Sequence, residues 1–378
     1  MENNHSYMPT LDVLRAFSII PVVFLHTSSS EFATKYVGYL GSYGVLLFFC
    51  ISGFLLSYLA FEEIKKNGYF HVRAFYMRRL LRIWPNYFLY IILINVFLLT
   101  NPDVTNWFLE LFLSVFFLGN LLNSIHPFVE GVPHGSIYFN ILWSLAVEEQ
   151  FYLFFPVILA LFTKNKFRTI IIACIGIAIV ITGLRYYLIQ LGLQLNYSKP
   201  YWPGIAFQTN TYFDIILFSV FLGYVKSTFK YKLSQKYTKM SLFSLVIIFV
   251  LLSFFFFRNL TYLEAKYSLG FIGMGIILGL ITYLSSFMDI NKKKIVSKIF
   301  ISIGKQSYGI YLFHIPISLI LSAVTYKVNI VVPFFTVWVF IISYMFSLFL
   351  YKYYEVHFRK IRTKHLPAST YALTKKSL

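Results

Sequence analysis

The chain has few charged residues and almost no cysteine. Asp, Glu, Lys and Arg make up only 12% of its 378 residues, about half the share in a soluble domain, and this excludes an ordinary soluble globular fold. Its two cysteines, Cys50 and Cys174, both lie in apolar runs. Two cysteines cannot form a disulfide framework or provide the usual four ligands of a zinc site, so we expect no metal.

Acidic residues are the scarcer of the charged types. There are 14 of them against 33 basic residues, which gives a net charge of +19. In a soluble protein this excess would suggest a nucleic-acid partner, whereas in a membrane protein it marks basic cytoplasmic loops. The chain is 58% hydrophobic with a mean hydropathy of +0.70, which excludes a disordered protein and favours the bilayer as its solvent.

Ten apolar stretches are long enough to cross about 30 Å of hydrocarbon as helices. They cover residues 11–29, 41–61, 83–100, 140–163, 169–189, 210–225, 241–257, 267–287, 299–322 and 331–351. The pattern predicts an all-α polytopic transmembrane helical bundle of about ten spans. The first ten residues lack Lys and Arg and no small-residue cleavage site follows the first apolar run, so we expect that run to remain as a span.

The distribution of basic residues between loops gives the topology. If residues 107–122 do not cross, 25 of the 33 basic residues lie on one side and five on the other, as the positive-inside rule requires of cytoplasmic loops. Both termini are then cytoplasmic, and we expect no nucleic-acid partner. The chain shows no linker, so we expect one transmembrane domain over residues 1–360 and a basic cytoplasmic tail over 361–378.

Ionisable side chains inside the predicted spans are candidates for function, because each one is costly in lipid. Arg15 and His26 are eleven residues apart, which is about three turns or 16 Å of helix, so they share a face. Glu148 and Glu149 are the only charges of the fourth span, where Ser144, Glu148 and Tyr152 form one polar stripe. A histidine with a carboxylate in reach suits general-base removal of a hydroxyl proton.

Other polar residues extend this pattern. Ser307, Tyr311 and His314 share one face of the ninth span, and Asp214 lies toward the outer side. Arg79 and Arg82 open the third span from the cytoplasm, where arginines can bind phosphate oxygens in bidentate fashion. Basic groups at the inner end and hydroxyl, carboxylate and imidazole groups toward the outer end would suit a phosphorylated cytoplasmic cosubstrate.

Structural explanations for the same residues remain open. His26 could bond a neighbouring helix carbonyl, and the two glutamates could be hydrated at the interface or paired with Arg185. Arg78, Arg79 and Arg82 could serve topology or bind lipid headgroups. A secondary transporter of a small solute or lipid-linked sugar would also bury ionisable groups, but the two similar halves expected of one are not visible.

Five segments, in order, resemble the membrane acyltransferase-3 family, whose bacterial members O-acylate sugars of the envelope or of exported polysaccharides. The segments are LDVLRAFSIIPVVFLH with Arg15 and His26, GVLLFFCISGFLLS with Ser52, FYMRRLLRIWP with Arg79 and Arg82, WSLAVEEQFYLFFP with Trp143, Ser144, Glu148 and Glu149, and IGKQSYGIYLFHIPI with Ser307, Tyr308, Tyr311 and His314. The resemblance runs from about residue 8 to 360.

The resemblance implies an acyl-coenzyme A donor, most commonly acetyl, and a sugar hydroxyl as acceptor. On this hypothesis Arg15, Arg79 and Arg82 bind the coenzyme A phosphates. His26 is the general base or carries the acyl group, and Glu148 or Glu149 orients it. Ser307, Tyr311, His314, Asp214 and Trp143 contact the acceptor.

The same resemblance implies a bacterial inner (plasma) membrane location and a carbohydrate partner, with association to a polysaccharide biosynthesis complex as one option. O-antigen, capsule, exopolysaccharide and peptidoglycan all remain open as acceptors. Some relatives carry an additional soluble hydrolase-like domain after the last span, where about 25 residues follow here. We therefore expect transfer to be completed in the membrane domain or passed to a separate protein.

Overall fold

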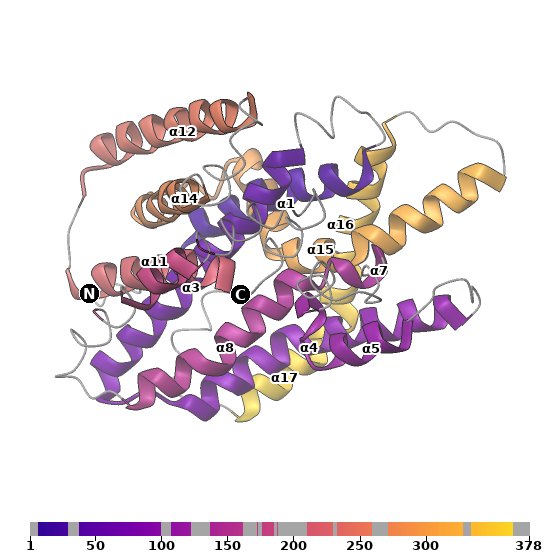
Figure 1. Ribbon diagram of the computed structural model, residues 1–378, viewed down its shortest axis with the longest axis horizontal. Helices are drawn as coiled ribbons and strands as arrows, with labels where there is room; N and C mark the ends of the chain where they lie inside the picture. Colours follow the sequence, from indigo (N-terminus) through magenta and orange to yellow (C-terminus); the bar gives the residue numbers. More distant parts are fainter. Residues whose placement is uncertain are drawn as a thin grey trace.

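The computed structural model describes residues 7–28, 38–99, 107–121, 137–161, 210–229, 233–258, 271–327 and 334–365, with short pieces between 172 and 187. This part of the chain is helical and contains no strand (Figure 1). The helices are α1 (Pro9–Thr27), α3 (Gly38–Asn67), α4 (Val72–Leu99), α5 (Trp107–Val115), α7 (Ile137–Asn140), α8 (Trp143–Leu161), α11 (Asn210–Thr228), α12 (Gln235–Arg258), α14 (Phe271–Ser285), α15 (Ile295–Lys327), α16 (Phe335–Tyr353) and α17 (Glu355–His365).

The helices confirm an all-α polytopic bundle. Among the described residues, seven are long and apolar enough to cross a membrane, namely α1, α3, α4, α8, α12, α15 and α16. Helices α11 and α14 coincide with two further predicted spans. Most of the predicted span 169–189 and the tail from residue 366 lie outside the described residues, and the predicted domain boundary at residue 360 falls inside α17.

The stretch 107–122, which we predicted not to cross, contains the short helix α5 (Trp107–Val115). It has nine residues, a length of about 13 Å, which is less than half the hydrocarbon thickness. A turn follows at Phe117, whose φ of 56° lies in the left-handed region. The Tyr87 hydroxyl of α4 donates to the carbonyl of Ser114 at 2.8 Å, so this end of α5 is bonded to α4.

The outer faces of the long helices are apolar. Helix α12 lies at the edge of the bundle beside α14 (Figure 1), and its Phe243 and Leu251 are 69% and 62% exposed. Exposed apolar surface of this extent would be a liability in water. In a bilayer this surface faces lipid chains. The polar residues inside the bundle are therefore the ones that indicate function.

Helices α1, α3 and α15 form the centre of the bundle, and glycine permits their close approach. Gly304 of α15 lies directly against the backbone carbonyl of Asp12 in α1, and Gly44 of α3 lies against the carbonyl of Ser18. A Cβ atom at either position would collide with main-chain atoms that cannot move aside. Because α1 packs closely against both α3 and α15, each side chain along α1 faces a fixed position on one of these helices.

We expect Gly304→Ala to destabilise the protein by about 3 kcal/mol, because the new methyl group overpacks the contact between α1 and α15. Gly273→Ala in α14 is the matched control, since nothing lies within 4 Å of its Cβ position. Unfolding of the purified proteins in detergent micelles measures both effects. Equal stability of the two variants would contradict the close approach.

Candidate active site

A cavity in the bundle brings together residues from five helices. Its lining comprises Arg15 of α1; Val45, Phe48, Phe49, Ser52, Leu55 and Leu56 of α3; Arg79, Arg82 and Ile83 of α4; Ser144, Leu145, Glu148 and Tyr152 of α8; and Ser307, Tyr308 and Tyr311 of α15. The space between them is about 800 Å³, including its open mouth. Every one of the five sequence segments singled out above contributes to this lining.

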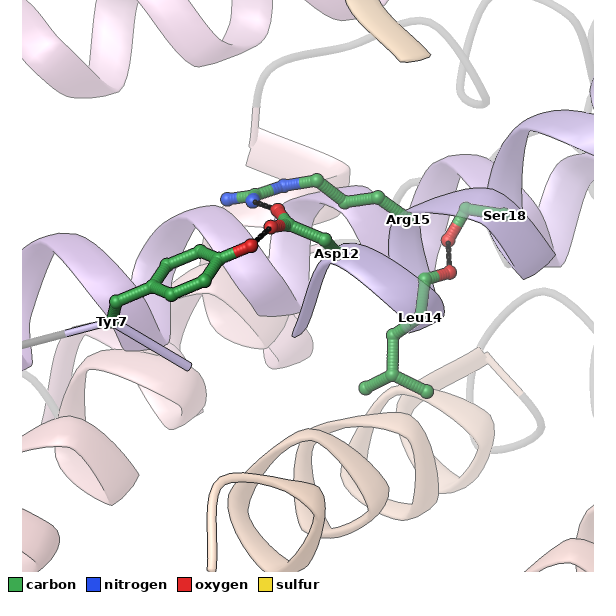
Figure 2. Close-up of polar contacts among 5 residues, drawn as sticks. All are labelled: Tyr7, Asp12, Leu14, Arg15 and Ser18. Carbon is green, nitrogen blue, oxygen red and sulfur yellow. Dashed lines mark hydrogen bonds and ion pairs between the residues drawn. The ribbon is translucent and has the colours of Figure 1, made fainter. Parts of the chain in front are cut away.

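Arg15 is held at the cavity by its own helix. Its guanidinium Nη1 donates to Asp12 Oδ1 at 2.7 Å, and the Tyr7 hydroxyl donates to Asp12 Oδ2 at 2.9 Å. Figure 2 shows the Asp12 carboxylate between these two donors. Burial and the nearby carboxylate raise the pKa of Tyr7 well above its ordinary value, so Tyr7 remains a hydrogen-bond donor. One carboxylate thus orients Arg15 and offsets its charge.

Arg79 and Arg82 make the cavity cationic. They are three residues apart on α4, and the charges of Arg15 and Arg82 both act on Arg79. The Arg79 guanidinium lies 5.6 Å from the ring centroid of Tyr152, and its buried Nε has no hydrogen-bond partner in the described part of the chain. Arg82 is exposed. A buried donor without an acceptor beside further guanidinium groups favours binding of an anion.

Glu148 faces the cavity with both of its oxygens engaged. The Ser52 hydroxyl donates to Oε1 at 2.9 Å and the Tyr152 hydroxyl donates to Oε2 at 3.0 Å. This confirms the predicted stripe, because Ser144, Glu148 and Tyr152 all line the cavity. Glu149 does not line it; its carboxylate lies beside Trp84, and its Oε1 has no hydrogen-bond partner among the described residues.

Two hydrogen-bonded hydroxyl groups form part of the cavity wall. The hydroxyl oxygens of Ser144 and Tyr311 are 2.7 Å apart, and Tyr311 also donates to the carbonyl of Ile141 at 2.6 Å. Ser144 therefore donates to Tyr311 when Tyr311 gives its proton to that carbonyl. Ser307 lines the same wall. The predicted face of Ser307 and Tyr311 is thus placed at the cavity.

His26 and His314 meet each other. His26 Nδ1 and His314 Nε2 are 2.9 Å apart, and the two rings are nearly parallel with centroids 5.1 Å apart. His314 is fully buried, whereas His26 is exposed. Neither histidine lines the cavity, but the ring of His314 lies 5.9 Å from that of Tyr311, which does. A glutamate was predicted to orient His26, but the hydrogen-bond partner observed for His26 is His314. Glu148 instead accepts from Ser52 and Tyr152.

Three predicted acceptor contacts lie outside the cavity lining, namely His314, described above, and Trp143 and Asp214. The ring of Trp143 packs against that of Tyr212, with centroids 5.1 Å apart and a tilt of 36° between the planes, and it meets Phe49 of the cavity lining edge to face. Asp214 accepts from Thr182 at 3.1 Å and from the backbone amide of Ile215 at 2.8 Å. Arg185, a possible partner of the glutamates, lies outside the described residues.

Four polar cavity residues were not among the predicted site residues, namely Ser52, Ser144, Tyr152 and Tyr308. Each one lies in a segment that resembles the family, and this resemblance was the sequence signal that could have identified it. Tyr308 donates to the carbonyl of Ile83 at 2.9 Å, two residues before Pro85 of α4. No three His, Cys, Asp or Glu side chains of the described ranges are placed to hold a metal ion.

Comparison with known proteins gives consistent matches. The model of a family described as an acyltransferase domain matches residues 8–352. The chain is 28% identical over 377 residues to the "Putative O-acetyltransferase SAS0844" of Staphylococcus aureus strain MSSA476, covering 95% of this chain and 58% of that protein. It is 28% identical over 377 residues to the O-acetyltransferase OatA of Staphylococcus aureus strain NCTC 8325, covering 94% and 57%.

The chain therefore spans a little more than half the length of the curated relatives it matches. No solved structure matches the chain.

We expect Ser52→Ala and Tyr152→Phe each to destabilise the protein by about 1.5 kcal/mol, because each removes one donor from a carboxylate. The double variant should lose more than the sum, since it leaves Glu148 without either bond. Tyr326→Phe, at a side chain 88% exposed, is the control and should change stability by less than about 0.5 kcal/mol. Strictly additive losses in detergent unfolding would argue against a shared carboxylate.

Proposed function

Because the chain belongs to the family of membrane acyltransferases whose model covers residues 8–352, we propose that it transfers an acetyl group from acetyl-coenzyme A to a carbohydrate hydroxyl. The acceptor belongs to the cell envelope or to an exported polysaccharide. The observation that carries this proposal is the cavity in which Arg15, Arg79 and Arg82 lie on the same lining as Ser52, Glu148 and Tyr311.

The arginines provide the donor site. The phosphates of acetyl-coenzyme A carry negative charge that complements the three arginines, and guanidinium groups bind phosphate oxygens in bidentate fashion. Arg82, the exposed member, meets the ligand first, and the free Nε of Arg79 takes an oxygen deeper in the cavity. The pantetheine arm then follows the cavity toward Ser144 and Tyr311, on the side where the histidine pair lies.

His26 activates the acceptor hydroxyl for attack on the acyl carbon. The thioester supplies an activated carbonyl, and His26 accepts the proton of the acceptor hydroxyl as general base. The hydroxyl oxygen forms a new C–O bond, the C–S bond breaks, and the coenzyme A thiolate leaves and takes up the proton. Tyr311 and Ser144 lie near this end of the cavity and stabilise the developing oxyanion by turning their hydroxyl protons toward it, away from the Ile141 carbonyl and from each other. In the two-step alternative, His26 first carries the acetyl group itself.

The loop charges support an orientation for this reaction. The end of the bundle at which α1 begins carries the basic loops, so the donor enters from the cytoplasm and both termini are cytoplasmic. His26 lies about 16 Å further along α1 than Arg15, toward the opposite face. We place the protein in a bacterial plasma membrane, with a carbohydrate as partner and a polysaccharide biosynthesis complex as one setting for it.

We expect His26→Ala to abolish acetyl transfer, with a loss of about 100-fold or more, because general-base catalysis contributes this much. Release of coenzyme A thiol and acetyl esters on the host's surface polysaccharide are measured together, at equal protein level. His357→Ala, at an exposed side chain of α17, is the control and should retain activity. Unchanged acetylation in His26→Ala would eliminate the assigned base. Solute accumulation without thiol release would instead identify a transporter.

We expect Arg82→Glu to weaken binding of acetyl-coenzyme A by about tenfold or more, because a charge-assisted contact becomes repulsive. Arg73→Glu is the matched control, since Arg73 is an exposed arginine on the same helix that does not line the cavity. Calorimetry on protein in nanodiscs of neutral lipid measures the affinity. If Arg82→Glu binds as the wild type does, while both variants lose binding to anionic vesicles, these arginines serve lipid headgroups.

A further inference from the structure

His314 makes two directional hydrogen bonds that are not interchangeable. Its Nδ1 lies 2.6 Å from the main-chain carbonyl of Tyr311, one turn earlier in α15, and its Nε2 lies 2.9 Å from Nδ1 of His26. A carbonyl oxygen can only accept. The contact with Tyr311 therefore requires the proton of His314 to be on Nδ1.

The surroundings of His314 keep its imidazole neutral. Its side chain has no exposed surface, and no carboxylate in the described part of the chain bonds to it. It is flanked in the sequence by Phe313 and Ile315, which are themselves buried. A buried imidazolium without a counter-ion is strongly disfavoured. A neutral ring with its proton on Nδ1 has a lone pair on Nε2, so Nε2 accepts.

This fixes the proton of His26. Because Nε2 of His314 accepts, Nδ1 of His26 must donate, and the single proton of a neutral His26 ring is then on Nδ1. The unprotonated nitrogen of His26 is Nε2. A general base acts through the nitrogen that carries the lone pair, so the main chain of α15 selects, through His314, the atom of His26 that can remove a proton.

We propose that His314 is a positioning residue that holds His26 in its Nδ1–H tautomer and presents Nε2 as the basic atom. The catalytic part rests on the proposed function, in which His26 Nε2 takes the acceptor hydroxyl proton while the C–O bond forms and the C–S bond to coenzyme A breaks. The tautomer follows from the two hydrogen bonds alone. The exposure of His26 against the full burial of His314 fits this division.

Two substitutions separate the two bonds of His314. In His314→Gln the terminal amide lies near the position of Nε2, and its oxygen can accept from His26. In His314→Asn the amide lies near the position of Nδ1, so it can donate to the Tyr311 carbonyl but does not reach His26. Both variants introduce a neutral amide at the same buried position, and they are compared at matched expression and thermal stability.

The tautomer is measured directly on the full-length protein in lipid bilayers. Solid-state NMR of protein with 15N,13C-labelled histidine, at about pH 8 where an ordinary imidazole is neutral, distinguishes a protonated Nδ1 from a protonated Nε2. The His26 signals are those missing in His26→Asn. We expect Nδ1–H in the wild type and in His314→Gln, and a shift to Nε2–H in His314→Asn. Nε2–H in the wild type, or no change in His314→Asn, overturns the proposal.

Kinetics test the consequence for transfer, with thiol release from acetyl-coenzyme A as the readout in membranes that acetylate their own polysaccharide. His314→Asn should lower kcat by about 100-fold, with an unchanged KM for acetyl-coenzyme A, whereas His314→Gln should stay within about tenfold of the wild type. A purely structural role would lower both variants equally.

These experiments distinguish failure of the proposed function from failure of the positioning role of His314. If His26→Ala abolishes transfer but His314→Asn leaves the tautomer unchanged, His26 remains the base and the positioning role of His314 is wrong. If His26→Ala leaves transfer intact, the base assignment fails, and the NMR result still decides the tautomer. If the NMR shift occurs but kcat is unaffected, the tautomer is correct and its role in catalysis is not.

Discussion

The close approach of α1 to α15 is the constraint on which the remaining arrangement depends. Gly304 meets the backbone of Asp12 near the beginning of α1, and His314 meets His26 near the end of α1. The two helices therefore run in the same direction. Without a glycine at residue 304 the axes would be further apart, and neither the histidine contact nor the placement of Arg15 beside the α15 hydroxyl groups would persist.

The polar groups inside the bundle fall into two kinds. Asp12 and Glu148 have all of their oxygens engaged by donors from their neighbours, as polar groups in a low-dielectric interior require. Within the described helices, the buried Nε of Arg79 has no acceptor. A site whose carboxylates are hydrogen-bonded while a guanidinium group keeps a free donor suits a ligand that brings negative charge, and this supports our proposal of an acyl-coenzyme A over a neutral solute.

Hydropathy located the hydrocarbon-crossing stretches but not the ends of the helices. The predicted span 83–100 is the apolar part of α4, which begins at Val72, and the predicted span 41–61 is the centre of α3, which continues to Asn67. In both helices the additional turns are basic or polar, because a helix can continue into the membrane interface where charges are solvated. The distribution of basic loops set residues 107–122 apart from the predicted spans, and the helix described there, α5, has nine residues, fewer than a span needs.

The sequence by itself determined which side chains share a face of one helix, because α-helical geometry depends only on spacing. The stripe of Ser144, Glu148 and Tyr152 and the order from Arg15 to His26 follow from it. Only the tertiary structure decided which helices meet. His26 bonds His314 while Glu148 bonds Ser52, and Asp214 and Trp143 lie outside the cavity lining. The rotation of each helix about its axis is set by close packing against its neighbours, and local spacing carries no information about that rotation.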